Sequence, residues 1–183
     1  MSRRRKNLIY LTGFMGSGKS TIAPILANTL GYSSRDIDAE IERITGKKVS
    51  DIFTDFGEPY FRGIEHTLLQ ESARLEGYII SLGGGTIANH ANLGIVKSAG
   101  ILVYLSASVD QILRRVKTKV NRPLLLAPNG ERLGEDELRS RISRLLRDRA
   151  PFYEQADVTI LTGDQPVGLT IDKIVRAINQ LVE

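Results

Sequence analysis

The stretch GFMGSGKST, residues 13–21, matches the pattern G-x-x-x-x-G-K-[ST] and decides the fold of this 183-residue chain. An apolar, strand-like run precedes it at 7–12, and apolar residues at helical spacing follow it through position 30. Glycines let several backbone N–H groups turn inward, and the start of the helix adds partial positive charge, so the stretch predicts a cradle for phosphate groups. The alternative, a tight turn with a structural lysine, leaves the flanking strand and helix unexplained.

Two side chains of this stretch have predicted roles. Lys19 supplies a mobile charge for the outer phosphates, and the hydroxyl of Ser20 takes one coordination position on Mg²⁺. Nucleoside triphosphate binding is therefore predicted. Seven residues are expected to contribute to it: Gly13, Gly16, Ser17, Gly18, Lys19, Ser20 and Thr21.

Composition restricts the class of protein. The net charge of +4 suits an anionic ligand, and 183 residues fit one α/β domain, which we place at 7–183 behind a flexible basic tail, 1–6. The tail lacks interleaved aromatic residues, so no nucleic-acid partner is predicted. The absence of cysteine excludes disulfides and thiolate metal sites. No apolar run approaches the roughly 20 residues that span a membrane, and a cytoplasmic monomer is expected.

Strands and helices alternate along the rest of the chain. Beyond 7–12, strands are predicted at 32–36, 77–82, 100–105 and 157–161, and helices at 21–30, 39–45, 58–75, 92–99, 109–118, 135–149 and 167–182. Ser50 is predicted to cap a short segment that Gly57 ends. The polar segment 119–134 has weak periodicity and is interpreted as a mobile lid. The alternation predicts a five-stranded parallel sheet with helices on both faces.

Two polar clusters follow predicted strands. Asp36 and Asp38 stand at i, i+2, and on a strand-like backbone this spacing points both carboxylates to one side, at the end where α/β proteins bind ligands. A helix cap is the other interpretation, and the residues alone leave both open. Gly83, Gly84 and Gly85 directly follow a buried strand and let a ligand approach the main chain, although a tight turn also explains them.

Other phosphate-loop classes find no support in the sequence. The chain has no Asn-Lys-x-Asp, which GTPases usually carry for guanine, and no apolar strand that ends in Asp-Glu, as in ATPase motors. A carboxylate pair, isolated arginines and a lid remain. Together they favour phosphoryl transfer to a small anionic acceptor.

The chain resembles shikimate kinases over 7–182, through six motifs in the family's order and spacing. These are the phosphate loop, Asp36-x-Asp38 with Ile41-Glu42, Gly57-Glu58 with Phe61-Arg62-x-x-Glu65, Gly83-Gly84-Gly85, Arg122-Pro123-Leu124-Leu125, and Arg149-x-x-x-Tyr153-x-x-x-Asp157. The resemblance implies a P-loop, nucleoside-monophosphate-kinase-like three-layer sandwich with a mobile lid and an acceptor-binding region at about 36–65. It also implies transfer of the ATP γ-phosphoryl group to the 3-hydroxyl of shikimate, with Mg²⁺, in the pathway to chorismate and aromatic amino acids.

The resemblance assigns roles to the acceptor residues. Asp38 would orient or deprotonate the attacking hydroxyl, while Asp36 would hold Mg²⁺ through water. Arg62 and Arg149 would clamp the shikimate carboxylate, which suits the planar guanidinium fork. Without the family motif, the other arginines of 139–149 are equally good candidates for the second arginine that binds the carboxylate.

The remaining family roles concern the glycines, the lid and the nucleotide. Gly83, Gly84 and Gly85 would shape the acceptor site. Arg122, in the lid, would swing over the transferring phosphoryl group and offset its charge together with Lys19. Arg115 and Pro166 match positions that contact adenine in the family.

Two positions depart from the family pattern. Pro24 stands in the second turn of the first helix, where glycine is common; it removes a hydrogen bond to Ser20 and should kink the helix. Leu82 stands before the triple glycine, where threonine is common. His66 and His90 have no paired ligand spacing and are expected to be surface or packing residues.

Two other functions remain open. A gluconate kinase would share the phosphate loop and the lid, although residues 83–85 and the two arginines weigh against it. A nucleotide-dependent binding or regulatory module would use the fold without catalysis. The basic tail is its only support.

Overall fold

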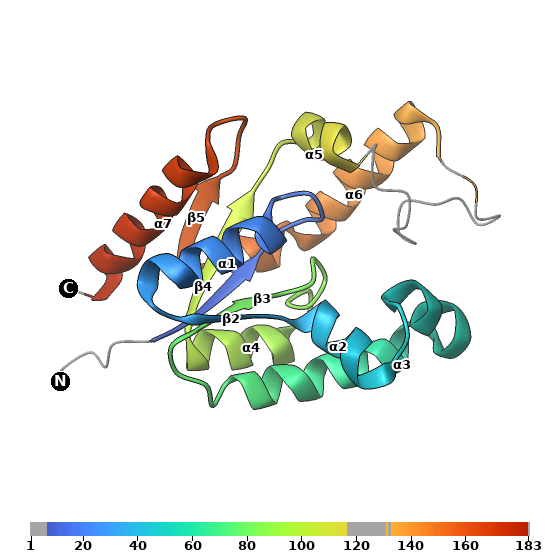
Figure 1. The fold of residues 1–183 in the computed structure, drawn as a ribbon. Coiled ribbons are helices and arrows are strands. Elements are labelled where there is room, and N and C mark those ends of the chain that lie inside the picture. Colours follow the sequence, from blue (N-terminus) through green and yellow to red (C-terminus); the bar gives the residue numbers. More distant parts are fainter. Residues whose placement is uncertain (1–6, 117–130, 132, 183) are drawn as a thin grey trace.

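The structure is a computed structural model, and it describes residues 7–116, 131 and 133–182. Strands and helices alternate along the chain, as Figure 1 shows. The strands are β1 (Leu8–Thr12), β2 (Ser33–Asp36), β3 (Tyr78–Ser81), β4 (Ile101–Ser106) and β5 (Val158–Leu161). The helices are α1 (Lys19–Leu30), α2 (Ile37–Thr45), α3 (Val49–Ser72), α4 (His90–Ala99), α5 (Val109–Val116), α6 (Glu135–Tyr153) and α7 (Val167–Val182).

The five strands form one sheet in the order β2-β3-β1-β4-β5, and every pairing is parallel. This confirms the predicted sheet. Strand β1 lies in the middle, with Ile9 opposite Ile79 of β3 on one side and opposite Ile101 of β4 on the other. Chain connections leave β1 toward one edge and later cross to the other. The glycine-rich loop after β1 therefore lies at the topological switch point, where open α/β sheets bind ligands.

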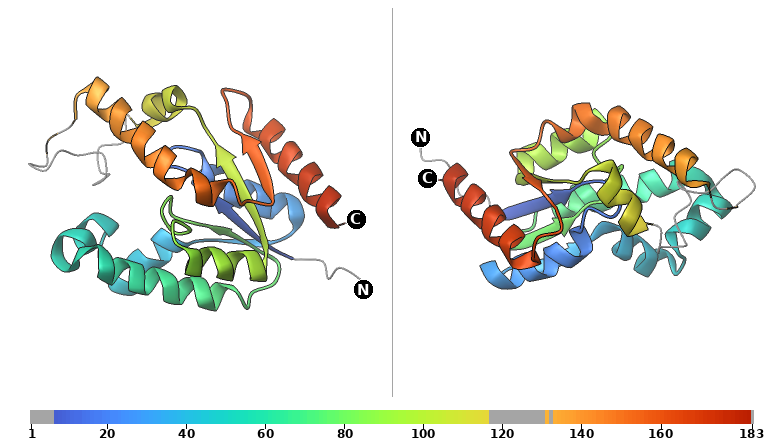
Figure 2. Two further views of the ribbon diagram at one scale, coloured as in Figure 1. Left: turned by 180° about the vertical axis from the view of Figure 1, so that it is seen from behind. Right: turned by 90° about the horizontal axis from the view of Figure 1, so that it is seen from above.

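Alternating side chains of β1 belong to two different cores. Leu8 and Tyr10 are buried against α2, α3 and α4, whereas Ile9 and Leu11 are buried against α1 and α7. Successive residues of a strand face opposite sides of the sheet, so both faces are covered by helices. The view from above in Figure 2 shows α1 and α7 on one side of the sheet and α4 and α6 on the other. A third cluster places Phe14 of the glycine-rich loop against α5 and α6.

Helix boundaries differ from the predicted ones at two points around the second strand. Helix α2 begins at Ile37, so Asp38 lies in a helix and the strand-based reason for its direction was wrong. Ser50 does not cap α3. The helix begins at Val49, whose N–H donates to a carboxylate oxygen of Glu42 at 3.0 Å, and Glu42 thus takes the role that Ser50 was expected to have.

Two further predictions concern glycine and proline. Gly57 interrupts α3 with a φ of 80°, a conformation that side chains rarely adopt, so the predicted break is confirmed. Helix α1 continues through Pro24 to Leu30 and ends at Gly31. Helix α6 continues past Arg149 as far as Tyr153, which puts these two residues one turn apart on the same helix.

Several predictions fall outside the described residues. These are the basic tail 1–6, Arg122, and the segment 119–134 apart from residues 131, 133 and 134. Among the helices of the described ranges, none combines the length and apolar character needed to cross a membrane.

Candidate active site

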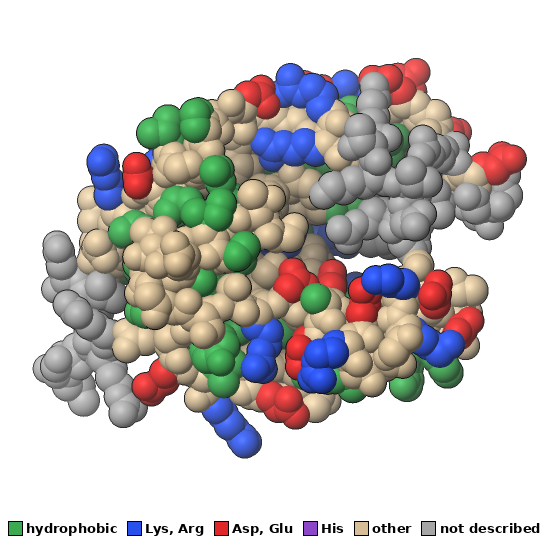
Figure 3. Space-filling model, in the orientation of Figure 1, with side chains coloured by type: hydrophobic (Ala, Val, Ile, Leu, Met, Phe, Trp, Pro, Cys, Tyr) green, Lys and Arg blue, Asp and Glu red, His purple; other side chains and the backbone are tan. Residues whose placement is uncertain are grey.

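A pocket of about 900 Å³ opens at the carboxyl ends of the strands. Its walls come from the glycine-rich loop after β1, the end of β2 with the start of α2, the turn after β3, and the loop between β5 and α7. Helices α3, α5 and α6 each add an arginine, namely Arg62, Arg115 and Arg149. Figure 3 shows acidic and basic side chains gathered side by side over α2 and α3, which border this region. We describe first the part of the pocket around the glycine-rich loop, where a nucleotide is predicted, and then the part around the turn after β3, where the acceptor is predicted.

The glycine-rich loop turns sharply between β1 and α1. Gly13 has a φ of 151°, and a Cβ there would lie 2.5 Å from the carbonyl oxygen of Leu105, so only glycine fits. Gly18 precedes α1 without a side-chain cap, so this residue has no side chain that competes with an anion for the positive end of the helix. The Lys19 ammonium donates to the carbonyl oxygens of Gly13 at 2.6 Å and Phe14 at 3.1 Å. These bonds hold the lysine along the loop.

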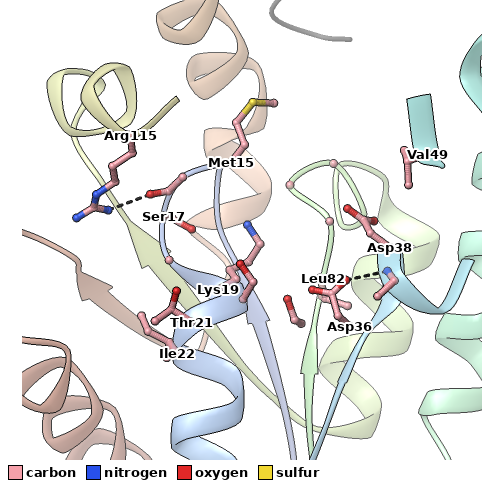
Figure 4. Close-up of a pocket in the computed structure, with 18 of the residues that line it drawn as sticks. Met15, Ser17, Lys19, Thr21, Ile22, Asp36, Asp38, Val49, Leu82 and Arg115 are labelled. Atoms are coloured by element: carbon pink, nitrogen blue, oxygen red, sulfur yellow. Dashed lines mark hydrogen bonds between the residues drawn. The ribbon is translucent and has the colours of Figure 1, made fainter. Parts of the chain in front are cut away.

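Arg115 connects the glycine-rich loop to the loop that follows the edge strand β5. Its guanidinium donates from Nη1 to the carbonyl oxygen of Gly16 at 2.9 Å and from Nη2 to that of Gly163 at 2.8 Å. Figure 4 shows Arg115 reaching from α5 to the loop. Pro166 lies between Gln165 and Val167, two residues that line the pocket. Of the two residues predicted to contact adenine, Arg115 lines the pocket and Pro166 is next to residues that do.

Asp36 and Asp38 both line the pocket, opposite Lys19 in the view of Figure 4. One carboxylate oxygen of Asp36 accepts the N–H of Ala39 at 3.1 Å and caps α2. The helix-cap interpretation is therefore correct for Asp36, and it coexists with the position of the side chain in the pocket. Ser20 lines the same pocket from the first turn of α1.

The available oxygen atoms suit a magnesium ion bound mainly by phosphate and water. The Ser20 hydroxyl and the second carboxylate oxygen of Asp36 are both hard donors of the kind Mg²⁺ prefers. Within the described residues there is no cluster of three histidine, cysteine, aspartate or glutamate side chains that could hold a metal. Mg²⁺ in nucleotide sites commonly takes only one or two protein ligands, so the donor set fits.

Charged side chains approach the triple glycine closely. Neither Gly83, Gly84 nor Gly85 has a positive φ, so backbone strain does not explain them. A Cβ on Gly83 would lie 2.9 Å from Oδ1 of Asp38. One on Gly85 would lie 2.8 Å from Nη2 of Arg62. These distances are shorter than a carbon atom tolerates, and the glycines therefore make room for the charged groups around them.

Arg62 and Arg149 meet at this turn from different helices. The same Cβ position on Gly85 lies 3.5 Å from Nη2 of Arg149, and a Cβ on Gly84 would lie 3.1 Å from its Nη1. Two guanidinium groups thus converge on one point beside Asp38. Such an arrangement is suited to a carboxylate, which accepts paired N–H bonds from a guanidinium fork.

Arg62 is held by two carboxylates of its own helix. Its guanidinium bonds Glu58 at 2.9 Å and Glu65 at 2.8 Å, and the Glu65 side chain is fully buried. Burial opposes the charge of Arg62, but the attraction of Glu65 and Glu58 outweighs it and raises the pKa of Arg62 above its usual value. The acceptor end therefore contains a permanent positive charge.

Arg149 is buried, with 8% of its surface exposed, and its guanidinium lies 5.4 Å from the centre of the Phe14 ring. One turn later, the Tyr153 hydroxyl donates to the carbonyl oxygen of Gly84 at 2.6 Å. Burial raises the pKa of Tyr153 to about 12, with a partial opposing effect from Arg149, so the hydroxyl keeps its proton. This bond attaches α6 to the turn of residues 83–85, which we call the glycine turn and which Arg149 also approaches.

The sequence had assigned no role to Glu65, although it belongs to a recognised motif. Its i, i+3 spacing from Arg62 on a predicted helix was the available signal for their ion pair. The attachment of Tyr153 to Gly84 had no such signal, because the two residues are 69 positions apart.

Comparisons with known proteins agree with this geometry. A family model for shikimate kinase matches residues 15–179. The chain is 41% identical to a shikimate kinase of Chloroherpeton thalassium over 177 residues, which cover 97% of this chain and 95% of the relative. A solved shikimate kinase from Acinetobacter baumannii, in complex with shikimate, superposes with a TM-score of 0.86 at 35% identity and covers 96% of this chain and 94% of that one.

A solved gluconokinase from Sinorhizobium meliloti is also similar in structure. Its TM-score is 0.61 at 17% identity, with 98% of this chain and 95% of that one covered. At this identity the likeness shows a shared fold alone.

Proposed function

This chain belongs to the shikimate kinase family, and from that premise we propose that it transfers the γ-phosphoryl group of ATP to the 3-hydroxyl of shikimate, in the pathway to chorismate and aromatic amino acids. One observation carries the proposal. Two guanidinium groups, from Arg62 and Arg149, converge on the glycine turn within the pocket that also contains the phosphate loop. An acid with a carboxylate at one end and a hydroxyl at the other can bridge these two parts.

The acceptor is held by its carboxylate. Arg62 and Arg149 supply the paired donors, and Gly83, Gly84 and Gly85 leave the space in which the ring of the acceptor lies against the main chain. Phe53 and Phe61 line the same pocket and supply apolar surface for the ring. Binding at several points fixes the direction of the reacting hydroxyl.

Asp38 accepts the hydrogen bond of the attacking hydroxyl. Its carboxylate lies beside the glycine turn and on the wall of the same pocket as the phosphate loop. It orients this hydroxyl and takes its proton as the bond to phosphorus forms. Lys19 leaves the carbonyl oxygens of Gly13 and Phe14 for the outer phosphates, where its charge offsets that of the transferring group.

Magnesium is the proposed cofactor. Ser20 would hold it directly and Asp36 through water, and the bound ion would neutralise charge on the outer phosphates. At the other end, Arg115 and Pro166 would contact adenine. Arg122, which lies outside the described residues, would cover the transferring group as it does in the family pattern.

The organisation of the protein is part of the same proposal. We place a single catalytic domain at 7–183, with the acceptor region at about 36–65, and expect a cytoplasmic monomer. Light scattering of the intact chain tests the oligomeric state.

The function is tested by ADP release with Mg²⁺ and ATP in three parallel reactions, with shikimate, with gluconate, and with no acceptor. Turnover that requires shikimate and collapses in Asp38→Asn supports both the reaction and the site. Preference for gluconate, or turnover that no acid accelerates, would contradict the proposal.

A further inference from the structure

Thr86, which follows the triple glycine, is buried and bonded at both its polar ends. Its hydroxyl donates to Oε1 of Glu65 at 2.6 Å. Its carbonyl oxygen accepts from Nδ2 of Asn92 at 2.7 Å. Glu65 and Asn92 are themselves 0% and 2% exposed. The end of the glycine turn is therefore fixed by two buried side chains that come from different helices, α3 and α4.

The orientation of the Asn92 amide follows from these bonds. Because Nδ2 donates to the carbonyl of Thr86, Oδ1 faces the other way, and it lies 2.6 Å from Nδ1 of His66. An amide oxygen only accepts, so Nδ1 of His66 must carry a proton. The N–H of Asn92 is in turn bonded to the side chain of Asn89 at 2.8 Å, which anchors it in the first turn of α4.

Glu65 and His66 are consecutive residues of α3, and they reach Thr86 by two routes. Glu65 binds the hydroxyl directly, while His66 binds the carbonyl through Asn92. The other oxygen of Glu65 holds Arg62, which reaches the pocket. A shift of Thr86 would therefore move the glycine turn and, through Glu65, the guanidinium group of Arg62. Networks of this kind act as units, because each bond fixes the geometry of the next.

We propose that Asn92 and His66 are positioning residues of the acceptor site. The inference rests on the proposed function, since it assigns these side chains to the site that binds the acid. His66 orients Asn92, and Asn92 holds the carbonyl group of Thr86. Both therefore act on the acceptor site through Thr86 and its bond to Glu65. The sequence offered no reason to single out His66, because Asn92 is 26 positions away along the chain.

Two substitutions at His66 separate the hydrogen bond from the volume of the ring. His66→Leu and His66→Asn have the same size and branching, but only asparagine places a donor near the position of Nδ1. We expect His66→Leu to raise KM for shikimate by about fivefold to tenfold, because a displaced clamp weakens binding of the acid. KM for ATP should stay within about twofold, and His66→Asn should restore most of the loss.

Asn92→Asp provides an independent variant at the centre of the network. A carboxylate has the same shape as the amide but cannot donate to the Thr86 carbonyl, so KM for shikimate should again rise. His90→Leu is the matched control. His90 is exposed on α4 and packs near the ring of Phe152, and its removal should leave both KM values unchanged.

Hydrogen exchange gives a readout that does not depend on turnover. The N–H groups of Thr86 and Ala88 bond to the carbonyls of Gly83 and Gly85, and they should exchange faster in His66→Leu than in the intact chain and in His66→Asn. If the intact chain does not use shikimate, the proposed function fails, and this comparison still decides whether His66 orders the turn. Equal behaviour of the leucine and asparagine variants, or a parallel rise of both KM values, overturns the inference.

Discussion

Nη1 of Arg62 lies 2.8 Å from Oε2 of Glu65, one helical turn further along α3, and the carboxylate is fully buried. A buried carboxylate needs a partner of opposite charge, and a guanidinium paired in this way has little freedom to move. The positive charge of the acceptor end is thus in place before any ligand arrives. Preorganised charge of this kind is what binding of an anionic acceptor requires.

Glu65→Gln is expected to weaken acceptor binding more than nucleotide binding. Glutamine keeps an acceptor for Thr86 but turns N–H groups toward Arg62, and the guanidinium loses its buried counter-charge. We expect KM for shikimate to rise about tenfold and the free energy of unfolding to fall by about 3 kcal/mol. Steady-state kinetics and urea unfolding measure the two effects.

Glu58→Gln is the control for this prediction. Glu58 binds the same guanidinium, but its side chain is 56% exposed, and exposed ion pairs contribute less than about 1 kcal/mol. If Glu58→Gln and Glu65→Gln have equal effects on KM, burial of the Glu65 pair does not matter and the prediction is wrong.

Gly85→Ala tests whether the glycine turn is needed for space. The added methyl group would lie 2.8 Å from Nη2 of Arg62, the mobile end of a long side chain, so the protein should still fold while the clamp is displaced. KM for shikimate should rise at least about tenfold with KM for ATP little changed. Gly94→Ala in α4 meets nothing within 4 Å and should stabilise the helix by roughly 0.5–1 kcal/mol. Unaltered acceptor binding in Gly85→Ala would leave the glycines as a simple tight turn.

Local patterns predicted the elements that local forces determine. The strand from Leu8 and the glycine-rich loop follow from an apolar run and from residues without side chains, and both are where they were expected. The start of α2 was misplaced by two residues, because the helix is capped by Asp36 and begins at Ile37 rather than at Ala39. Capping of α3 by Glu42 was missed, since it joins residues of two helices.

The candidate site needed the tertiary structure. The helix 135–153 carries several arginines, and no spacing rule distinguishes Arg149 from Arg144 or Arg147 without the family motif. In the structure Arg149 is buried beside Phe14, whereas the other two are exposed. Burial, which depends on the packing of distant segments, makes the distinction that the pattern of charges does not.

Tyr153→Phe tests the attachment of α6 to the glycine turn. Burial raises the pKa of Tyr153 from 10.0 to about 12, so the unfolded chain loses this proton at lower pH than the folded protein does. Stability from this group is therefore complete below about pH 10 and is lost as the pH rises to about 12, with a loss of at most about 3 kcal/mol. Urea unfolding at a series of alkaline pH values should show a smaller decline in Tyr153→Phe.

Tyr10 contributes to the same decline, because burial also raises its pKa, and some loss at alkaline pH will remain in the variant. Tyr60→Phe is the matched control for loss of a tyrosine hydroxyl, since Tyr60 is 47% exposed, and near neutral pH it should unfold at nearly the same urea concentration as the intact chain. Near neutral pH, Tyr153→Phe should cost about 1–2 kcal/mol, because the Gly84 carbonyl loses its donor. An unchanged pH profile in Tyr153→Phe would contradict the assignment.

Arg115 and Arg114 are neighbours on α5 that allow a matched test of the nucleotide end. Arg115 joins the carbonyl oxygens of Gly16 and Gly163, so Arg115→Ala should loosen both walls of that end and raise KM for ATP by about tenfold, with KM for shikimate within about twofold. Arg114 pairs with Asp164 at the surface, where the side chains are 62% and 72% exposed, and Arg114→Ala should leave both constants unchanged. Both variants remove one positive charge at nearly the same place. An equal rise of KM for ATP in the two would therefore assign the effect to the general field of the protein, and a rise confined to Arg115→Ala would assign it to the two carbonyl contacts.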